Sequence, residues 1–376
     1  MNPRGYVCSS CSTVYSANEL IWRCSCGGHL DVGRAPGLAP DEIDTGRRGL
    51  WRYNKVLESP PEGPSITLGE GMTPLVPVSW EGSELLLKLD YLCPSGSFKD
   101  RGAAVMMNRL WELGVRSVAE DSSGNGGASI AAYSAAAGID CTIFVPAHTS
   151  EGKVVQTRMY GAEVVKVPGS REDTAVAAQT FSAETGVFYA SHNWHPLFVE
   201  GVKTVAYEIW EQLGFVAPDN VVAPAGFGSN VLGLYRGFSE LLAAGQIARL
   251  PRIFAAQAAN CAAIHDAWKG TPAGPRIPTI AEGVATSAPV RVPEILEALR
   301  ESRGDTVAVS EEAIILALKS VGREFGLFVE PTTAVCAAAA RQLCESGVVG
   351  PGEVTVAIMT GHGLKAVDSL SGLRPV

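Results

Sequence analysis

Apolar runs of strand length alternate with longer segments in which apolar residues recur at helical spacing, over most of the chain beyond residue 85. The apolar runs end in glycine or serine before the next helical pattern begins. The predicted strands are 85–89, 117–119, 142–145, 162–167, 187–190, 221–224, 253–257, 306–309 and 354–359. The predicted helices include 103–113, 127–137, 152–160, 172–185, 201–213, 230–244, 293–301, 311–325 and 332–345. This repetition predicts an α/β fold with mainly parallel sheets covered by helices on both faces.

The first 35 residues show a different pattern. Two closely spaced cysteine pairs flank a short segment with aromatic residues, and Gly27-Gly28 allows a tight turn beneath the second pair. Two thiol pairs at this spacing can hold one tetrahedral Zn²⁺, although the second pair is C-x-C where C-x-x-C is usual. The predicted ligands are Cys8, Cys11, Cys24 and Cys26. We favour a zinc-ribbon-like segment over residues 1–35 with a structural role; the alternatives are four free thiols on a tail, or His29 in place of one thiol.

Residues 36–65 are rich in proline, glycine and charge, and we expect a linker there. The longest apolar stretch, 128–145, is interrupted by Gly138-Ile-Asp140 and predicts a helix followed by a strand, with no membrane span. With 30 Lys and Arg against 39 Asp and Glu, the net charge of −9 argues against nucleic-acid or anionic-membrane partners. Of the nine cysteines, four lie in the first segment and the others are scattered singly. This distribution and the lack of a charged-then-apolar leader suit a reducing cytoplasm.

Lys99 has an unusual predicted position, in the stretch Ser95-Gly-Ser-Phe-Lys-Asp-Arg. It follows an apolar run and opens a helix, with Ser97 as the expected N-cap. The dipole disfavours a positive charge at a helix start, so a surface lysine is better placed in the last turn. An uncharged lysine amine can condense with an aldehyde to form a Schiff base, and burial favours that form. On position alone, a Schiff-base lysine and an ordinary solvated lysine are equally good interpretations.

Two glycine-rich loops each join a predicted strand to a helix. The loop 121–129 (DSSGNGGAS) offers hydroxyls and N–H groups as a cradle for a substrate carboxylate. The loop 224–230 (PAGFGSN) aims backbone donors and a helix dipole at an anion, for which phosphate is the natural guest. Position 231 is valine where a dinucleotide fingerprint needs glycine, and no Gly-Lys-Ser/Thr follows. These departures argue against a nicotinamide dehydrogenase and against a P-loop enzyme.

A third loop, Thr360-Gly-His-Gly-Leu-Lys, ends the last predicted strand. Thr360 can offer a neutral hydroxyl to a ring nitrogen, whereas His362 and Lys365 are expected to serve the turn and the surface. Together with Lys99 and the two glycine-rich loops, this points to pyridoxal phosphate, with Asn125 near its ring hydroxyl. A hydroxyl partner stabilises a protonated pyridine less than a carboxylate does, which favours elimination or replacement at the β or γ carbon over transamination. The residues assigned to the cofactor are Lys99, Asn125, Ala225, Gly226, Phe227, Gly228, Ser229, Asn230 and Thr360.

Several segments of the chain resemble those of the threonine synthase family of fold-type II pyridoxal phosphate enzymes, and they stand in the family's order. The matching segments are the Cys8 to Cys26 ribbon, 70–75 (EGMTPL), 95–101 (SGSFKDR), 123–125 (SGN), 199–204 (VEGVKT), 224–230, 329–333 (VEPTT) and 360–365 (TGHGLK). The resemblance implies a two-lobed, tryptophan synthase β-like enzyme and a homodimer. It places the large lobe at 36–90 plus 201–376 and the small lobe at 91–200. Lys99 is the implied catalytic residue, and the implied substrate-binding residues are Ser122, Ser123, Gly124, Asn125 and Gly126.

Two positions depart from the family pattern around the substrate phosphate. Gly126 stands where the family usually has threonine or serine, and Phe198 stands where it usually has arginine. Each lost charge-assisted hydrogen bond is worth roughly 1.5–3 kcal/mol. The residues that could compensate are Lys153, Arg158, Lys203 and His192.

The leading hypothesis is conversion of O-phospho-L-homoserine and water to L-threonine and phosphate. The alternative within the same chemistry is β-replacement or β-elimination on a serine derivative, phosphoserine or threonine. A non-catalytic zinc-ribbon adaptor is a third hypothesis, and the acidic balance and the Lys99 stretch argue against it.

Overall fold

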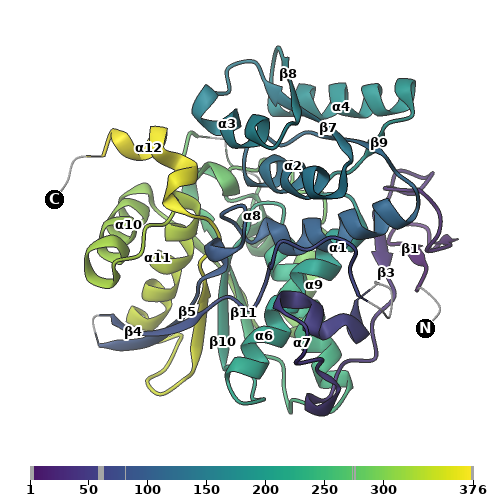
Figure 1. Ribbon diagram of the computed structural model, residues 1–376. Helices are drawn as coiled ribbons and strands as arrows, with labels where there is room; N and C mark the ends of the chain where they lie inside the picture. The colour runs from purple at the N-terminus through teal and green to yellow at the C-terminus, as the bar shows by residue number, and fades with distance from the viewer. Residues whose placement is uncertain (1–3, 58–62, 81, 273, 275–276, 374–376) are drawn as a thin grey trace. The chain divides into compact units, whose positions relative to one another are not determined.

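The computed structural model describes residues 4–57, 63–80, 82–272, 274 and 277–373 (Figure 1). Its contacts divide the chain into two compact units. Unit 1 comprises Met1–Ala35, Asp44–Glu70 and Cys93–Val202, and unit 2 comprises Pro36–Ile43, Gly71–Leu92 and Lys203–Val376. Over the described residues, no helix combines the length and the apolar character needed to cross a membrane.

Unit 1 is built around a parallel sheet with the described strand order β8-β7-β6-β9. Alternate residues of these strands face opposite sides. Ala119 and Phe144 pack in one cluster with Ala178 of α4, whereas Val118 and Ile143 share the other cluster with α1 and α2. The sheet therefore lies between two helical layers (Figure 1). The bounds are α1 Lys99–Glu112, β6 Ser117–Glu120, α2 Asn125–Ala137, β7 Asp140–Pro146, α3 Glu151–Met159, β8 Glu163–Val167, α4 Arg171–Thr185, β9 Phe188–Tyr189 and α5 Pro196–Val202.

The N-terminal part of unit 1 forms a small antiparallel sheet of order β2-β1-β3. Its strands are β1 Tyr6–Cys8, β2 Val14–Tyr15 and β3 Leu30–Val32. Two turns of this sheet carry the cysteine pairs. The predicted linker that follows is more ordered than expected, because it contains the 3-10 helices Pro40–Glu42 and Gly49–Val56, and Trp51 and Tyr53 are buried. Residues 58–62 of that stretch lie outside the described residues.

Unit 2 holds a second sheet with the described order β12-β11-β10-β13-β5-β4, parallel except for β4 at one edge. Val222, Phe254 and Ala256 pack with residues of α10 and α11 in one core cluster. The alternate strand residues are also buried, and α7 contacts the same strands. The bounds are β4 Leu75–Trp80, β5 Ser83–Lys88, α6 Thr204–Gln212, β10 Asn220–Pro224, α7 Ser229–Ala243, β11 Arg252–Ala258, α8 Ala263–Lys269, α9 Val292–Glu301, β12 Asp305–Val309, α10 Glu311–Phe325, α11 Pro331–Glu345, β13 Thr355–Ile358 and α12 Val367–Ser371.

The predicted fold class is confirmed, and so are the nine predicted strands, each within a few residues. The helix predicted over 201–213 is wrong at its start, because α5 ends at Val202 and α6 begins at Thr204. The antiparallel edge strand β4 and the short helices α8 and α12 were not predicted. Short elements carry too few periods to be recognised by hydrophobic spacing.

Candidate active site

Lys99 is the first residue of α1, as the sequence predicted. The expected N-cap is wrong, because Phe98 occupies the cap position and the buried Ser97 hydroxyl makes no hydrogen bond among the described residues. The turn is instead fixed by Asp100, whose carboxylate accepts three hydrogen bonds of 2.6 Å. The donors are the N–H and hydroxyl of Ser95 and the hydroxyl of Ser129. A buried carboxylate with three donors holds the start of α1, and therefore Lys99, in one place.

The Lys99 amine lies beside two aromatic rings. Its Nζ is 4.6 Å from the ring centroid of Phe98 and 5.5 Å from that of Phe198. Phe198 is fully buried, and a Cβ at Gly102 would lie 2.6 Å from its ring. Glycine at 102 therefore lets α5 bring the phenyl ring against α1, next to the amine. The Lys99 side chain is half-buried in this setting.

The loop between β6 and α2 carries the predicted carboxylate cradle. The Ser122 hydroxyl accepts from the N–H of Gly124 at 3.4 Å, and a Cβ at Gly127 would lie 2.1 Å from the Ser122 carbonyl oxygen. The first main-chain bond of α2 runs from the N–H of Ala128 to the carbonyl of Gly124. The N–H groups ahead of Ala128 lie outside the helix ladder and form the positive end of the helix dipole.

A buried pair next to this loop, Glu120 and His192, was not predicted as a unit. The imidazole Nδ1 of His192 lies 2.7 Å from Glu120 Oε1, and the His192 N–H donates to Glu120 Oε2 at 3.1 Å. Burial lowers the pKa of His192 well below its usual value and raises the pKa of Glu120 to about 7. A Cβ at Gly126 would lie 2.8 Å from both Cε1 and Nδ1 of the imidazole. The ring of His192 also lies 5.6 Å from that of Phe198, edge to face.

The strand end beside Glu120 is closed by a second buried carboxylate, Asp121. It accepts from the Tyr189 hydroxyl at 2.8 Å and from the Arg171 guanidinium at 2.9 Å. Burial, followed by the charge of Glu120, raises the pKa of Asp121. Neither set of contacts could be recognised in the sequence, because the partners stand 50 to 72 residues apart along the chain.

In unit 2, the loop 224–230 leads from β10 into α7 with little room for side chains. Gly228 has φ +86, and a Cβ there would lie 2.2 Å from Ile295 Cδ1. A Cβ at Gly226 would lie 2.7 Å from the carbonyl oxygen of Gly283. The first α7 bond runs from the N–H of Leu232 to the Gly228 carbonyl, so the N–H groups ahead of Leu232 lie outside the helix ladder. The Asn230 amide is buried, and its Oδ1 has no hydrogen-bond partner among the described residues.

Thr360 follows β13 and is buried. Its hydroxyl lies 3.1 Å from that of Thr333, which also accepts from the Gly361 N–H at 2.8 Å. Glu330 was not predicted as a site residue; its carboxylate stands 2.1 Å from the position of a Cβ at Gly361. His362 serves the turn, as predicted, because its Nδ1 accepts from the Leu364 N–H.

A pyridoxal-phosphate dependent enzyme family model matches residues 66–361. The chain belongs to this family. It is 35% identical to a threonine synthase of Methanocaldococcus jannaschii over 96% of this chain and 93% of that protein. It is also 35% identical to a threonine synthase of Mycobacterium bovis over 81% of this chain and 84% of that protein.

Solved structures agree on the fold. An O-ureido-L-serine synthase matches with a TM-score of 0.69 at 21% identity, covering 81% of this chain and 94% of that one. A threonine deaminase from Solanum lycopersicum matches with a TM-score of 0.67 at 25% identity, covering 77% and 79%. The chain is thus a pyridoxal phosphate-dependent enzyme with the fold-type II architecture, as the sequence predicted.

Both units contribute residues whose chemistry suits pyridoxal phosphate. The loop 224–230 offers main-chain donors in a turn where added side-chain atoms would collide, which suits close approach by a phosphate. Lys99 supplies a half-buried amine, and Thr360 supplies a buried neutral hydroxyl. Position 360, the last residue before the Gly361 turn, thus carries a neutral hydroxyl and not a carboxylate.

The four N-terminal thiols of this pyridoxal phosphate-dependent enzyme come together. The ligand atoms of Cys8, Cys11, Cys24 and Cys26 lie within 4.8 Å of one another, with Sγ–Sγ distances of 3.5 Å for Cys8–Cys26 and Cys11–Cys24. A tetrahedral zinc with Zn–S bonds of about 2.3 Å holds its sulfurs about 3.8 Å apart, so the cluster fits that ion. A hydrogen bond with the Tyr15 hydroxyl lowers the pKa of Cys24 to about 6. His29 lies outside the cluster and stacks on Trp194, with ring centroids 4.2 Å apart.

Two of the four residues considered as compensating phosphate ligands form ion pairs with other side chains. Lys203 is fully buried in unit 2 and donates to Glu240 at 2.9 Å. Arg158 is exposed and pairs with Glu151. Lys153 lies half-buried on α3. His192, the fourth candidate, lies beside Gly126 and Phe198, the two positions at which the sequence departs from the family pattern.

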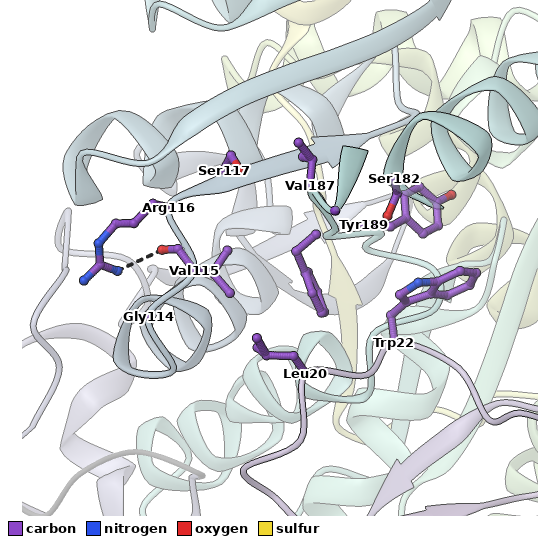
Figure 2. A pocket seen from close by; sticks show the side chains of 11 residues that line it. Leu20, Trp22, Gly114, Val115, Arg116, Ser117, Ser182, Val187 and Tyr189 are labelled. Atoms are coloured by element: carbon purple, nitrogen blue, oxygen red, sulfur yellow. Dashed lines mark hydrogen bonds between the residues drawn. The ribbon is translucent and has the colours of Figure 1, made fainter. Parts of the chain in front are cut away.

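An open cavity of about 430 Å³ lies elsewhere in unit 1, at the β9 edge of the parallel sheet (Figure 2). Figure 2 shows Leu20 and Trp22 of the N-terminal segment on one side of it and Val187 and Tyr189 on the other. The described residues that line it include none of the predicted site residues.

Proposed function

We propose that this enzyme is a lyase of the threonine synthase type, which converts O-phospho-L-homoserine and water to L-threonine and phosphate. The observation that carries the proposal is 35% identity to a protein named threonine synthase over 96% of the chain. The position of Lys99 at a fixed helix start and the glycine-rich loop before α7 support it.

The proposed cofactor ligands stand on four loops. Lys99 binds the cofactor aldehyde, Asn125 the ring hydroxyl and Thr360 the ring nitrogen. The phosphate is bound by Ala225, Gly226, Phe227, Gly228, Ser229 and Asn230. The substrate carboxylate is bound by Ser122, Ser123, Gly124, Asn125 and Gly126.

Pyridoxal phosphate, when bound, delocalises the electron pair left on the substrate's α carbon after that carbon loses its proton. Lys99 Nζ accepts that proton, and the three hydrogen bonds to Asp100 hold the start of α1, and with it the amine, in place. Thr360 donates or accepts one neutral hydrogen bond, which suits elimination and replacement better than transamination. The helix dipoles of α2 and α7 attract the carboxylate and phosphate anions.

The test is the release of phosphate and the amino-acid product formed from O-phospho-L-homoserine, with Lys99→Ala as the comparison. Wild type is expected to form phosphate and threonine in equal amounts. Lys99→Ala is expected to lose at least about 10³-fold in turnover, because it removes the proton acceptor and the aldehyde ligand. A wild-type enzyme that loads the cofactor but releases no phosphate would reject the proposal.

A second candidate is β-elimination or β-replacement on another amino acid, such as a serine derivative, phosphoserine or threonine. It is favoured by Phe198, which puts a buried phenyl ring beside Lys99 where a guanidinium is usual in the family. Its test is a shift of the bound cofactor's absorbance on adding each of these amino acids to an enzyme inert toward O-phospho-L-homoserine.

We further propose a structural Zn²⁺ on Cys8, Cys11, Cys24 and Cys26, a homodimer, and a cytoplasmic location. The proposed domains are a zinc-ribbon-like segment 1–35, a large lobe 36–90 plus 201–376, and a small lobe 91–200. The cluster of four thiols supports the proposed Zn²⁺ site. Metal analysis and sedimentation of the purified protein test the ion and the dimer.

A further inference from the structure

The first peptide of the loop 224–230 is held by a side chain of the neighbouring strand. The ladder between β10 and β11 ends at Pro224, which pairs with Ala256. Beyond that pair, the Ala225 N–H still donates to the Ala256 carbonyl at 2.8 Å, but the Ala225 carbonyl accepts from the side-chain amide of Gln257 at 2.9 Å. Gln257 lies on β11 and is fully buried. A side chain thus holds the main chain at the point where the loop leaves the sheet.

The orientation of the Gln257 amide is fixed by its two partners. Its Oε1 accepts from the main-chain N–H of His265, in the first turn of α8, at 2.9 Å. The imidazole Nδ1 of His265 lies 2.8 Å from the Thr306 hydroxyl of β12, which anchors this part of α8 to the same sheet. Because one partner is an N–H and the other a carbonyl, a reversed amide would set N–H against N–H and oxygen against oxygen. Gln257 therefore presents its NH₂ group to the Ala225 carbonyl in a single orientation.

The Ala225 carbonyl and the Gly226 N–H belong to one planar trans peptide, so fixing the first also fixes the second. In a trans peptide the two groups point in opposite directions, and the Gly226 N–H therefore points away from Gln257. Gly226 is buried, yet its N–H donates to no group among the residues that the structure describes. A buried main-chain donor is almost always paired, so this one indicates a ligand. The Cα of Gly226 cannot move far, because a Cβ there would lie 2.7 Å from the Gly283 carbonyl oxygen.

We propose that Gln257 is a positioning residue for the cofactor: its amide holds the Ala225–Gly226 peptide so that the Gly226 N–H donates to the phosphate of pyridoxal phosphate. This inference rests on the proposed assignment of the loop 224–230 to that phosphate. Gln257 acts through the peptide, since its NH₂ group binds the Ala225 carbonyl and its Oε1 binds the start of α8. A hydrogen bond from an N–H to a phosphate is charge-assisted, and it weakens steeply when the N–H is turned away from the oxygen.

The test compares pyridoxal phosphate with pyridoxal, which has the same ring and aldehyde but no phosphate. Each is titrated into full-length wild-type apoenzyme and into Gln257→Met, and the absorbance of the bound form gives the dissociation constant. Methionine has a similar shape to glutamine but no amide, so the Ala225 carbonyl loses its donor. In Gln257→Met, the dissociation constant of pyridoxal phosphate is expected to rise about 10- to 100-fold, and that of pyridoxal by less than about twofold.

Asn220→Leu is the matched control for the loss of a buried amide. Asn220 is fully buried at the start of β10, at the opposite end of the strand from the loop. Its amide donates to the Thr355 hydroxyl at 3.0 Å and accepts from Arg252 at 2.7 Å. Asn220→Leu is expected to lower the free energy of unfolding in urea, as Gln257→Met does, and to leave both dissociation constants within about twofold of wild type.

A measurement on the wild type does not depend on the folding of any variant. The nitrogen-15 and proton resonances of the Gly226 amide are expected to move downfield when pyridoxal phosphate is added, because the N–H then donates to a charged oxygen. Pyridoxal is expected to leave both resonances largely unchanged.

Three results would overturn the inference: an equal loss of affinity for both compounds in Gln257→Met, no loss for either, or a Gly226 amide that does not respond to pyridoxal phosphate. If Gly228→Ala, in the same loop, still weakens pyridoxal phosphate, the assignment of the loop stands and the role of Gln257 alone is rejected. If neither variant weakens it, the loop does not bind the phosphate, and the proposed assignment fails together with the inference. These results do not depend on whether O-phospho-L-homoserine is the substrate, so failure of the proposed reaction is distinguished by its own assay.

Discussion

Gly126 and His192 occupy complementary space, since a Cβ on the first would stand 2.8 Å from two ring atoms of the second. That distance is below any ordinary carbon contact, so one of the two must move when position 126 gains a side chain. The imidazole is also tied to Glu120 at 2.7 Å, so its movement breaks a buried hydrogen bond.

Gly126→Ala is therefore expected to displace the imidazole or the loop 121–129, which is proposed to bind the substrate carboxylate. Loss of one charge-assisted hydrogen bond to that carboxylate would raise KM for O-phospho-L-homoserine about 10- to 100-fold. Steady-state kinetics measure the change. Gly322→Ala, in the last turn of α10, is the matched control, because a Cβ there meets nothing closer than 3.9 Å. If both alanine variants keep the wild-type KM, the steric relationship has no role in binding.

Gly228→Ala is expected to weaken binding of pyridoxal phosphate. The residue has φ +86, and its added Cβ would stand 2.2 Å from Ile295, so the turn before α7 must shift. Gly245→Ala is the matched control, since Gly245 has φ +69 but open space around its Cβ. Both variants bear a similar backbone penalty of about 1 kcal/mol.

Titration of each apoenzyme with the cofactor, followed by absorbance, separates the backbone penalty from the steric effect. We expect at least a tenfold higher dissociation constant for Gly228→Ala than for Gly245→Ala. Equal constants would mean that the loop before α7 does not hold the cofactor phosphate.

The long elements and the chemistry-bearing loops could be predicted because their signals are local. Strand 220–224 and helix 311–325 each combine an unbroken pattern with clear ends, and Ser310 caps the latter as a serine should. The loop 224–230 was recognised from its glycines, and its Gly228 has the positive φ that such a turn needs.

Contacts between distant residues could not be predicted. The Glu120–His192 pair joins positions 72 apart, and neither residue type at its own position indicates a partner. The wrong N-cap prediction at Ser97 has the same origin, because capping preferences depend on the residue type alone. In the structure, Asp100 accepts hydrogen bonds from Ser95 and Ser129, and these bonds fix the turn instead. From the sequence, Lys203 was a candidate to bind the substrate phosphate. Its burial against Glu240 results from tertiary packing, which the sequence pattern does not reveal.

Lys203→Met is expected to destabilise the enzyme by about 3–5 kcal/mol, because it leaves the Glu240 carboxylate buried without its cation. Tyr207 donates to the same carboxylate at 2.8 Å but carries no charge to balance it. Urea unfolding of the holoenzyme measures the change. Adding Glu240→Leu to Lys203→Met is expected to restore most of the loss, and failure of the double variant to recover would show that the ion pair is not the cause.

The thiol cluster is expected to bind one zinc per chain and to need it for the stability of the N-terminal sheet. A small three-stranded sheet has little apolar core of its own, and a metal ligand adds to its stability. Cys24→Ser removes one of the four sulfurs and is expected to lose the metal, as measured by elemental analysis, and to expose the first 35 residues to limited proteolysis. Cys344→Ser, on α11 and outside the cluster, is the matched control and is expected to retain both the metal and the resistance. A metal-free wild type whose N-terminal segment resists proteolysis as well as before would show that the four thiols lie together without serving as ligands.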